Sequence, residues 1–248
     1  MIHFFIVILA AYYNLDDMYK TSFPNSCTVS NAKCICFEML STEELDLINN
    51  SSIEVTYKKG EKICKQGTFI PHVILLTEGL AKVYLEFSNK PLILKVITPR
   101  NLIGLTSVFE GNNIFHYSSK AYIDSKAILI DINVFRKILS QNLKFANSII
   151  NILCENSIQT FNRFYSFTHK QLYGRMADIL LCLSERIFKS KEFELNFSRK
   201  ELSELMGMST ESVIRMLKKF REDGTIQIVD KKLRILDYDA LMKISELG

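Results

Sequence analysis

The residues with the clearest chemical potential form a short polar run near the C-terminus. Thr210, Glu211, Ser212 and Arg215 follow Ser209, and Glu211 and Arg215 are four positions apart. On a helix this spacing puts both side chains on one face. An arginine donates two hydrogen bonds to guanine O6 and N7, and a carboxylate accepts one from cytosine N4, each worth roughly 1–3 kcal/mol of discrimination. The alternative is a surface ion pair worth less than about 1 kcal/mol.

The pattern around this run predicts two helices joined by a tight turn. Ser198 and Glu201 have the spacing of a capping box, which begins a first helix. Gly207 supplies the positive φ that a short turn needs, and Ser209 is a natural N-cap for a second helix, from Thr210 to about Arg221. The inward faces of the two helices are expected to be Leu202, Leu205 and Met206, and Val213, Met216, Leu217 and Phe220.

A β-hairpin follows the two helices. Asp223-Gly224 ends the second helix, residues 226–229 and 233–236 read as the strands of a wing, and residues 193–195 form a strand-like lead. Helix, short turn, helix and wing together are typical of a winged helix-turn-helix that enters the DNA major groove. We expect a second set of basic residues to meet phosphates, which position a protein without reading sequence. This set is Arg199, Lys200, Lys218, Lys219 and the wing lysines Lys231 and Lys232.

The stretch SRKELSELMGMSTESVIRMLKKFREDGTI resembles the helix-turn-helix of the Crp/Fnr family of transcription regulators, with its E-x-x-x-R recognition helix. YKKGEKICKQG, EGLAKVYLE and RMADILLCL occur upstream in the family's order, so the resemblance covers roughly residues 27–248. It implies a homodimer that binds a palindromic double-stranded DNA site and touches RNA polymerase, and it implies that Glu211 and Arg215 read bases. Family members that read other half-sites differ at the position of Thr210, which leaves the target sequence and the sign of regulation open.

The expected fold class is α+β, with three parts. An N-terminal antiparallel β-roll (residues 27–140) acts as the sensor, a dimerisation helix spans residues 141–168, and the winged helix-turn-helix spans residues 169–248. Short β-branched and aromatic runs separated by turn residues predict the roll. These expected strands are residues 53–57, 73–77, 81–87, 92–97, 117–123 and 127–132, after a helix that begins with the capping box Ser41–Glu44.

The segment Phe145 to Phe167 lacks Gly and Pro and predicts one long helix. The residues expected at heptad-like spacing are Ile150, Leu153, Ser157, Thr160, Phe164 and Phe167. Two interpretations stay open, a helix packed on its own domain and a two-stranded dimer helix. Residues 171–188 predict another amphipathic helix.

Composition limits the class of protein. Of 248 residues, 48% are hydrophobic and 23% charged, which suits a globular protein with two modest domains. The net charge of +4 permits nucleic-acid contact without arguing for it. No run reaches the roughly 18 apolar residues of a membrane span, so no membrane partner is expected. Six cysteines are too few for a disulfide scaffold and favour a reducing cytoplasm.

Residues 1–26 are interpreted as a tail. The apolar stretch Met1 to Tyr13 has no Lys or Arg and so lacks the positive region of a secretory signal. An over-extended start, with Met18 as the initiator, is the preferred interpretation. His72, His116 and His169 are scattered, and no set of residues supports an enzyme.

Two kinds of sensing known in the family can be compared with the residues. Cyclic-AMP-binding members hold ribose with a Gly-Glu-Leu segment and phosphate with an arginine. The matching stretches here, residues 99–105 and 118–120, lack that Glu and that Arg, and Lys120 substitutes only as a point charge. The sequence therefore argues against cyclic AMP and predicts no cofactor, with an unidentified small molecule as effector.

The other kind uses an iron–sulfur cluster held by N-terminal cysteines. Cys27, Cys34 and Cys36 lie in the corresponding region, but their spacing departs from the family pattern, and no cysteine occurs at residues 127–130, where a fourth ligand belongs. A cluster or a simple thiol response at these three cysteines is the alternative hypothesis. A further rival keeps the roll as a ligand-binding module and gives the winged domain a protein contact.

Overall fold

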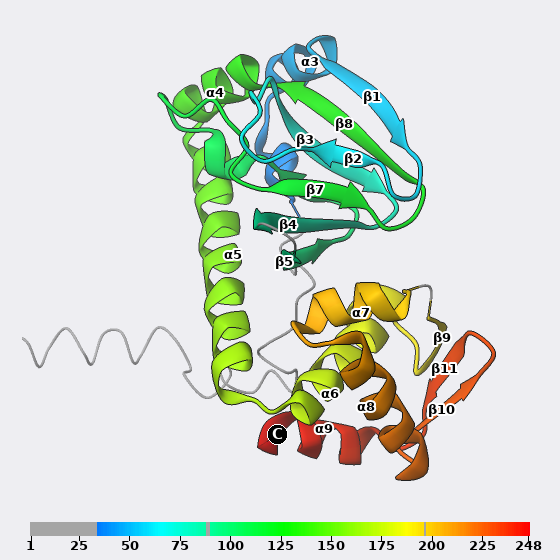
Figure 1. The fold of residues 1–248 in the computed structure, drawn as a ribbon. Coiled ribbons are helices and arrows are strands. Elements are labelled where there is room, and N and C mark those ends of the chain that lie inside the picture. The colour runs from blue at the N-terminus through cyan, green and yellow to red at the C-terminus, as the bar shows by residue number, and fades with distance from the viewer. Residues whose placement is uncertain (1–33, 88–89, 196) are drawn as a thin grey trace, which may run out of the picture.

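The computed structural model describes residues 34–87, 90–195 and 197–248. An antiparallel β-roll, a long helix and a C-terminal winged helix-turn-helix follow one another along the chain (Figure 1). The α+β fold class predicted from the sequence is confirmed. None of the helices in the described ranges has the length and apolar character to cross a membrane.

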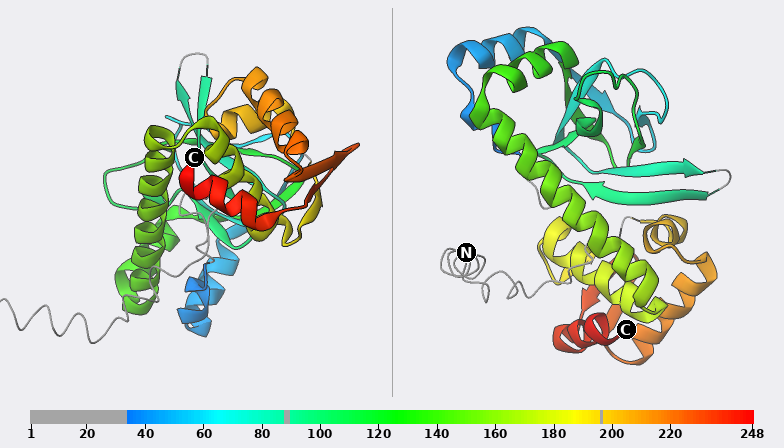
Figure 2. Two further views of the ribbon diagram at one scale, coloured as in Figure 1. Left: turned by 90° about the horizontal axis from the view of Figure 1, so that it is seen from below. Right: turned by 90° about the vertical axis from the view of Figure 1, so that its left-hand side faces the viewer.

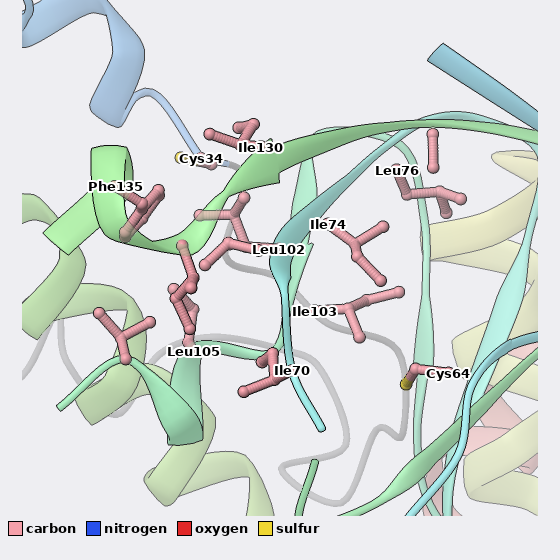
Figure 3. Packing of buried hydrophobic residues seen from close by; sticks show 14 of the residues in the cluster. Cys34, Cys64, Ile70, Ile74, Leu76, Leu102, Ile103, Leu105, Ile130 and Phe135 are labelled. Carbon is pink, nitrogen blue, oxygen red and sulfur yellow. The ribbon is translucent and has the colours of Figure 1, made fainter. Parts of the chain in front are cut away.

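The roll consists of two four-stranded antiparallel sheets, with strand orders β1-β8-β3-β6 and β2-β7-β4-β5. Their apolar inner faces enclose one core, which includes Ile74, Leu76 and Ile103, and Figure 3 shows part of this packing. The strands are β1 (Ser52–Tyr57), β2 (Lys62–Cys64), β3 (His72–Glu78), β4 (Ala81–Phe87), β5 (Lys90–Ile97), β6 (Asn101–Ile103), β7 (Ser118–Ala121) and β8 (Ser125–Asp131).

Three helices close one end of the roll, and side-chain caps define where they begin. α3 (Thr42–Asn50) begins with a complete capping box between Ser41 and Glu44. Asp131 caps α4 (Ile132–Gln141), and Asn142 caps α5 (Leu143–His169). The Asn142 amide also donates to the Glu44 carboxylate at 2.8 Å, which ties the start of α5 to α3. Phe135 and Phe145, both fully buried, join α4 to α5 through an edge-to-face contact at 5.2 Å.

The C-terminal region is built around α6 and a three-stranded sheet of order β10-β11-β9. The helix-turn-helix is formed by α7 and α8, and β10 and β11 form the wing (Figure 1). The bounds are α6 (Leu172–Cys182), a π-helical segment (Leu183–Phe188), β9 (Glu192–Glu194), α7 (Arg199–Met206), α8 (Thr210–Glu222), β10 (Ile226–Val229), β11 (Lys232–Ile235) and α9 (Tyr238–Leu247).

The winged region packs directly on the roll. One apolar cluster includes Leu80, Tyr84 and Tyr122 of the roll together with most of the winged core, and Tyr122 meets Phe197 edge-on at 5.0 Å. The two side chains of the ion pair between Lys82 of β4 and Glu204 of α7 are only 11% and 15% exposed, and their N–O distance is 2.6 Å. Removing one partner of such a pair is costly because the other charge is left buried. Figure 2 shows α5 running along both regions.

The structure contains elements that were not predicted from the sequence, and others whose bounds differ from those predicted. The three-residue strands β2 and β6 and the C-terminal α9 were not predicted, and β7 covers only the middle of the expected 117–123. The helix expected over 171–188 is α-helical to Cys182 and then continues as the π segment. Cys182 is buried, whereas Cys154 is exposed.

The heptad-like set in α5 divides between two faces. Ile150 and Phe164 are exposed, but Leu153 packs against the roll core, and Phe167 contacts the helix-turn-helix. The spacing of apolar residues correctly predicts an apolar stripe along α5. The roll and the winged region bury part of this stripe, so only the remainder is exposed. The exposed apolar residues of α5 are Leu143, Ile150, Ile158, Phe161, Phe164 and Tyr165.

The turn between β3 and β4 supplies a test of the roll's packing. Gly79 has a φ of +93°, and a Cβ there would lie 2.6 Å from the Cα of Ser125. Gly79→Ala combines a left-handed backbone cost with overpacking, so we expect a loss of about 3 kcal/mol in the free energy of unfolding, measured by urea titration. Gly111→Ala is the control, because its φ is +83° with no heavy atom within 4 Å. Equal losses in the two variants would contradict the packing argument.

Candidate DNA-binding interface

The helix-turn-helix begins and ends through local interactions encoded by adjacent residues. Ser198 and Glu201 complete the predicted capping box of α7, and Gly207 ends it with a φ of 59°. The Ser209 side chain accepts from the Ser212 N–H at 3.1 Å and caps α8. The buried faces of the two helices match those expected, except that Met216 is only partly buried.

The predicted base-reading residues gather at the N-terminal end of α8. Glu211 and Arg215 are exposed. Within the described ranges they form no ion pair with each other or with any other residue. A hydrogen bond of its own backbone N–H, with a further bond from Ser209, lowers the pKa of Glu211. The carboxylate therefore stays ionised and acts as an acceptor at neutral pH. The Ser212 hydroxyl accepts from Ser209, and the Thr210 hydroxyl donates to Ser203 at 3.5 Å.

The basic residues expected at phosphates are exposed at the start of α7, on the later turns of α8 and in the wing. Arg199 and Lys200 occupy the exposed first turn of α7. Lys218 pairs with Glu222 at 3.6 Å, and the Lys219 ammonium lies 4.3 Å from the centre of the Tyr173 ring. Lys218 and Lys219 follow Arg215 by three and four positions, so they lie about one turn further along α8.

The turn between α7 and α8 is clamped from behind by α5 and α6. Arg163 of α5 donates to the Leu205 carbonyl at 2.8 Å, and Arg175 of α6 donates to the Met206 carbonyl at 3.3 Å. Both guanidinium groups lie over the ring of Phe167, at 4.6 and 5.7 Å. A Cβ at Gly207 would lie 2.9 Å from that ring, so the turn and Phe167 are in close contact.

A cavity of about 980 Å³ lies before the turn and the first residue of α8. Lys200, Ser209 and Thr210 line one side of it, and strands β4 and β5, through Tyr84 and Leu92, line the other. Glu211 and Arg215 are not part of this cavity's lining and remain exposed.

Comparison with known domains follows the same division of the chain. A model of the cyclic nucleotide-binding domain matches residues 54–142, and a model of the Crp-like helix-turn-helix domain matches residues 174–244. Together the two matches take in well over half of the chain, in the order roll then helix-turn-helix.

The chain belongs to the Crp/Fnr family. Electron transport regulator A of Shewanella oneidensis is 23% identical over 215 residues, which is 84% of each chain. The transcriptional activator protein anr of Pseudomonas aeruginosa is 23% identical over 185 residues, covering 73% of this chain and 75% of that protein. This Crp/Fnr chain is therefore a DNA-binding transcription regulator.

Solved structures of Crp/Fnr proteins share the fold. FixK2 from Bradyrhizobium japonicum superposes with a TM-score of 0.72 at 18% identity, covering 79% of this chain and 98% of that one. A putative regulator of the crp/fnr family from Eubacterium rectale gives a TM-score of 0.72 at 19% identity, covering 86% and 99%.

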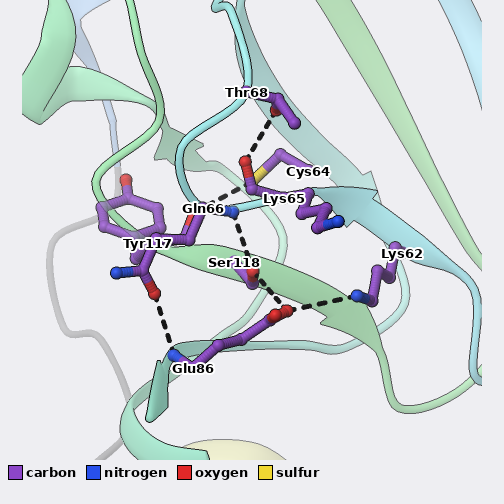
Figure 4. Close-up of polar contacts among 8 residues, drawn as sticks. All are labelled: Lys62, Cys64, Lys65, Gln66, Thr68, Glu86, Tyr117 and Ser118. Atoms are coloured by element: carbon purple, nitrogen blue, oxygen red, sulfur yellow. Dashed lines mark hydrogen bonds and ion pairs between the residues drawn. The ribbon is translucent and has the colours of Figure 1, made fainter. Parts of the chain in front are cut away.

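The described cysteines of this Crp/Fnr regulator are not arranged as the ligand set of the alternative iron–sulfur hypothesis. Cys34 and Cys36 form a disulfide, and Cys27 lies outside the described residues. Figure 3 shows Cys64 on the far side of the roll core from Cys34. In Figure 4 the Cys64 thiol donates to the Tyr117 carbonyl, and burial raises its pKa to about 12. Within the described ranges no three His, Cys, Asp or Glu side chains gather as a metal site.

The same Crp/Fnr roll contains an inner cavity of about 220 Å³ between β5 and α5. Lys95 and Arg163 are the two basic side chains in its wall, and Tyr117 and Thr106 add hydroxyl groups. The Lys95 ammonium donates to Asn156 of α5 at 2.7 Å. Burial lowers the pKa of Lys95 to about 8 and that of Arg163 to about 9.

Sequence reasoning missed Lys95 and Arg163. Arg163 had one available signal, because it is the only charged residue between Glu155 and Lys170 apart from a titratable histidine. A lone arginine in an otherwise uncharged part of a long helix favours a specific buried partner over solvent exposure. Lys95 has no comparable signal, since it occupies an ordinary strand position.

Proposed function

We propose that this regulator binds DNA as a homodimer, reads a palindromic site with Glu211 and Arg215 of each copy, and responds to a small anion in the inner cavity of the roll. The observation that carries the proposal is that Glu211 and Arg215 are exposed and unpaired on one face at the start of α8. A two-fold dimer inserts two such helices into successive major grooves about 34 Å apart.

The division of labour on DNA follows from the chemistry of the side chains. Glu211 and Arg215 contact base edges, with Thr210 and Ser212 beside them. Arg199, Lys200, Lys218 and Lys219 contact phosphates and hold the helix in register. Contact with RNA polymerase is part of the same proposal and rests on the family resemblance alone.

Arg215→Ala tests the base-reading role. Each bidentate contact discriminates by roughly 1–3 kcal/mol, so we expect affinity for the selected site to fall roughly 5- to 150-fold and specificity to relax at one position of each half-site. The measurement is selection from random duplex DNA, followed by titration of the selected site. The same selection is done in air and with dithiothreitol, to test the alternative that DNA binding is under redox control. The Cys34–Cys36 disulfide supports this alternative.

Lys231→Ala is the control for Arg215→Ala. A phosphate contact in the wing contributes about equally on every sequence and reduces the salt dependence by about one unit of slope. An Arg215→Ala protein that selects the same site with unchanged affinity would exclude Arg215 as a reader of bases.

The exposed face of α5 supports the homodimer. Phe161 and Phe164 are 68% and 69% exposed, and Ile150, Ile158 and Tyr165 extend the same face along the helix. Monomeric proteins rarely leave such a continuous apolar surface open to water. A second copy of α5 would cover it by heptad packing.

Phe161→Glu tests the dimer. A carboxylate in the centre of this face would be desolvated on association, so we expect the variant to be monomeric by sedimentation and to lose at least tenfold in affinity for the palindromic site. Asn133→Glu introduces the same charge at an exposed position of α4 and should remain dimeric. A Phe161→Glu protein that sediments as a dimer would show that another surface joins the copies.

The inner cavity supports an anionic effector. Two basic side chains line it, and within the described ranges no carboxylate pairs with Lys95 or Arg163. The volume of about 220 Å³ falls below the range of ~300–1,000 Å³ that is usual for drug-sized ligands, so it suits a compact anion. Arg163 also donates a hydrogen bond to the Leu205 carbonyl. An anion that binds this guanidinium therefore competes with the bond between α5 and the helix-turn-helix.

The charge on Lys95 predicts how effector binding depends on pH. Its pKa of about 8 in the folded protein lies below the ordinary value, so Lys95 is protonated at pH 6.5 and largely neutral at pH 9.5. We expect inorganic phosphate, titrated by calorimetry, to bind more weakly as pH rises through about 8, and we expect Lys95→Met to bind weakly at all pH values. Cyclic AMP and acetate are the comparison ligands. Phosphate affinity that is unchanged in Lys95→Met would place any anion elsewhere.

A further inference from the structure

The geometry points to a second ligand site, separate from the inner cavity, which binds an aliphatic carboxylate between the roll and the winged region. This cavity has a volume of about 430 Å³, within the range of small-molecule sites. It does not share a lining residue with the inner cavity.

Both regions supply its apolar wall, and the surface contains much more carbon than oxygen or nitrogen. This wall is lined by Leu80, Tyr122 and Ile123 of the roll and by Ile187, Phe188 and Phe197 of the winged region. Such a surface gains free energy by covering a hydrocarbon chain, at ~25 cal/mol per Å² of apolar area removed from water.

Three basic side chains complete the lining, and no acidic residue of the described ranges contributes to it. Arg100 comes from the turn before β6, whereas Arg186 lies in the π segment and Lys189 directly follows it. Two carboxylates act on this group from outside the cavity. Glu38 forms an exposed pair with Arg100 at 3.2 Å, and Glu185 acts on Arg186, whose pKa is lowered by burial. Among the described residues, Lys189 is the lining cation to which no carboxylate is paired, which favours a ligand with one negative charge.

The backbone at these basic residues supplies an independent observation. Three non-glycine residues of the described chain have a positive φ, and two of them, Arg100 (68°) and Lys189 (49°), line this one cavity. Left-handed backbone at such residues is costly and persists only where the surroundings enforce it, and it concentrates at ligand sites.

Hydrogen bonds hold both of these turns in place. Asn101 donates to the Thr98 carbonyl at 3.0 Å across the Arg100 turn. The Ser184 hydroxyl donates to the Ser190 carbonyl at 2.7 Å across the Lys189 turn. The two turns, one in each region, are therefore held in place, and the basic residue of each lines the same cavity. A carboxylate between these two basic residues would reduce their mutual repulsion, while its chain would lie on the apolar wall.

The ligand class follows from this combination. A compact inorganic anion would leave the apolar wall uncovered, and a neutral hydrocarbon would leave Lys189 without a counter-charge from the described residues. An aliphatic monocarboxylate satisfies both. Because it touches the roll and the winged region at once, it would favour their docked arrangement in proportion to its differential affinity.

Decanoate is the probe, and calorimetry on the full chain at constant salt is the measurement. We expect saturable binding of one decanoate per chain, with 1-decanol and acetate each at least tenfold weaker, because each lacks one half of the required chemistry. The double variant Arg100→Gln, Lys189→Gln should lose at least fivefold in decanoate affinity. Lys137→Gln, Lys243→Gln removes two exposed charges that do not line the cavity and should bind like the parent.

A second variant tests the wall independently of charge. Ile123→Trp fills part of the cavity from a half-exposed position and should weaken decanoate binding while leaving phosphate binding to the inner cavity unchanged. The site is excluded if decanol binds as well as decanoate, if Arg100→Gln, Lys189→Gln keeps the parent affinity, or if Ile123→Trp binds decanoate normally. None of these measurements uses DNA, so their failure is distinguishable from a failure of the proposed base-reading role.

Discussion

A guanidinium removed from water requires acceptors and a fixed position, and the buried Arg163 imposes that constraint on this molecule. Its acceptor is the Leu205 carbonyl at the end of α7, and its flat face lies over Phe167, which in turn contacts Gly207. One side chain of α5 therefore reaches both the inner cavity of the roll and the turn of the helix-turn-helix. Any change that displaces Arg163 must alter a hydrogen bond to the segment that orients α8.

The docking of the two regions depends on a second desolvated interaction, that between Lys82 and Glu204. Two charges only 11% and 15% exposed gain little net stability over an apolar contact of similar size, because desolvation offsets most of their attraction. Their contribution is to orientation, since leaving either charge unpaired and buried is costly. The apolar contact of Tyr122 with Phe197 stabilises the docking of the two regions. The ion pair restricts how α7 lies on β4. A ligand bound across the two regions acts on this same balance.

Local chemistry explains which parts of the fold could be predicted from the sequence. The limits of α7 and α8 follow from Ser198, Gly207 and Ser209, whose capping and turn roles involve residues no more than a few positions away. The outward face of α5 could not be predicted in full, because Leu153 and Phe167 have the heptad spacing but are covered by other parts of the chain. The strands β2 and β6 are only three residues long and carry no periodicity of their own. Each of the three cavities joins residues distant in sequence, so no local motif indicates them.

The relative magnitudes of two interactions favour base reading by Glu211 and Arg215 over a structural role. An exposed pair four residues apart on a helix contributes well under 1 kcal/mol, and in this chain that spacing forms a pair at Lys218 and Glu222 but not at Glu211 and Arg215. A base contact discriminates by roughly 1–3 kcal/mol. Neither side chain has to break an ion pair to enter the groove, and Glu211 exchanges only exposed local hydrogen bonds, so most of that difference is available to distinguish one sequence from another.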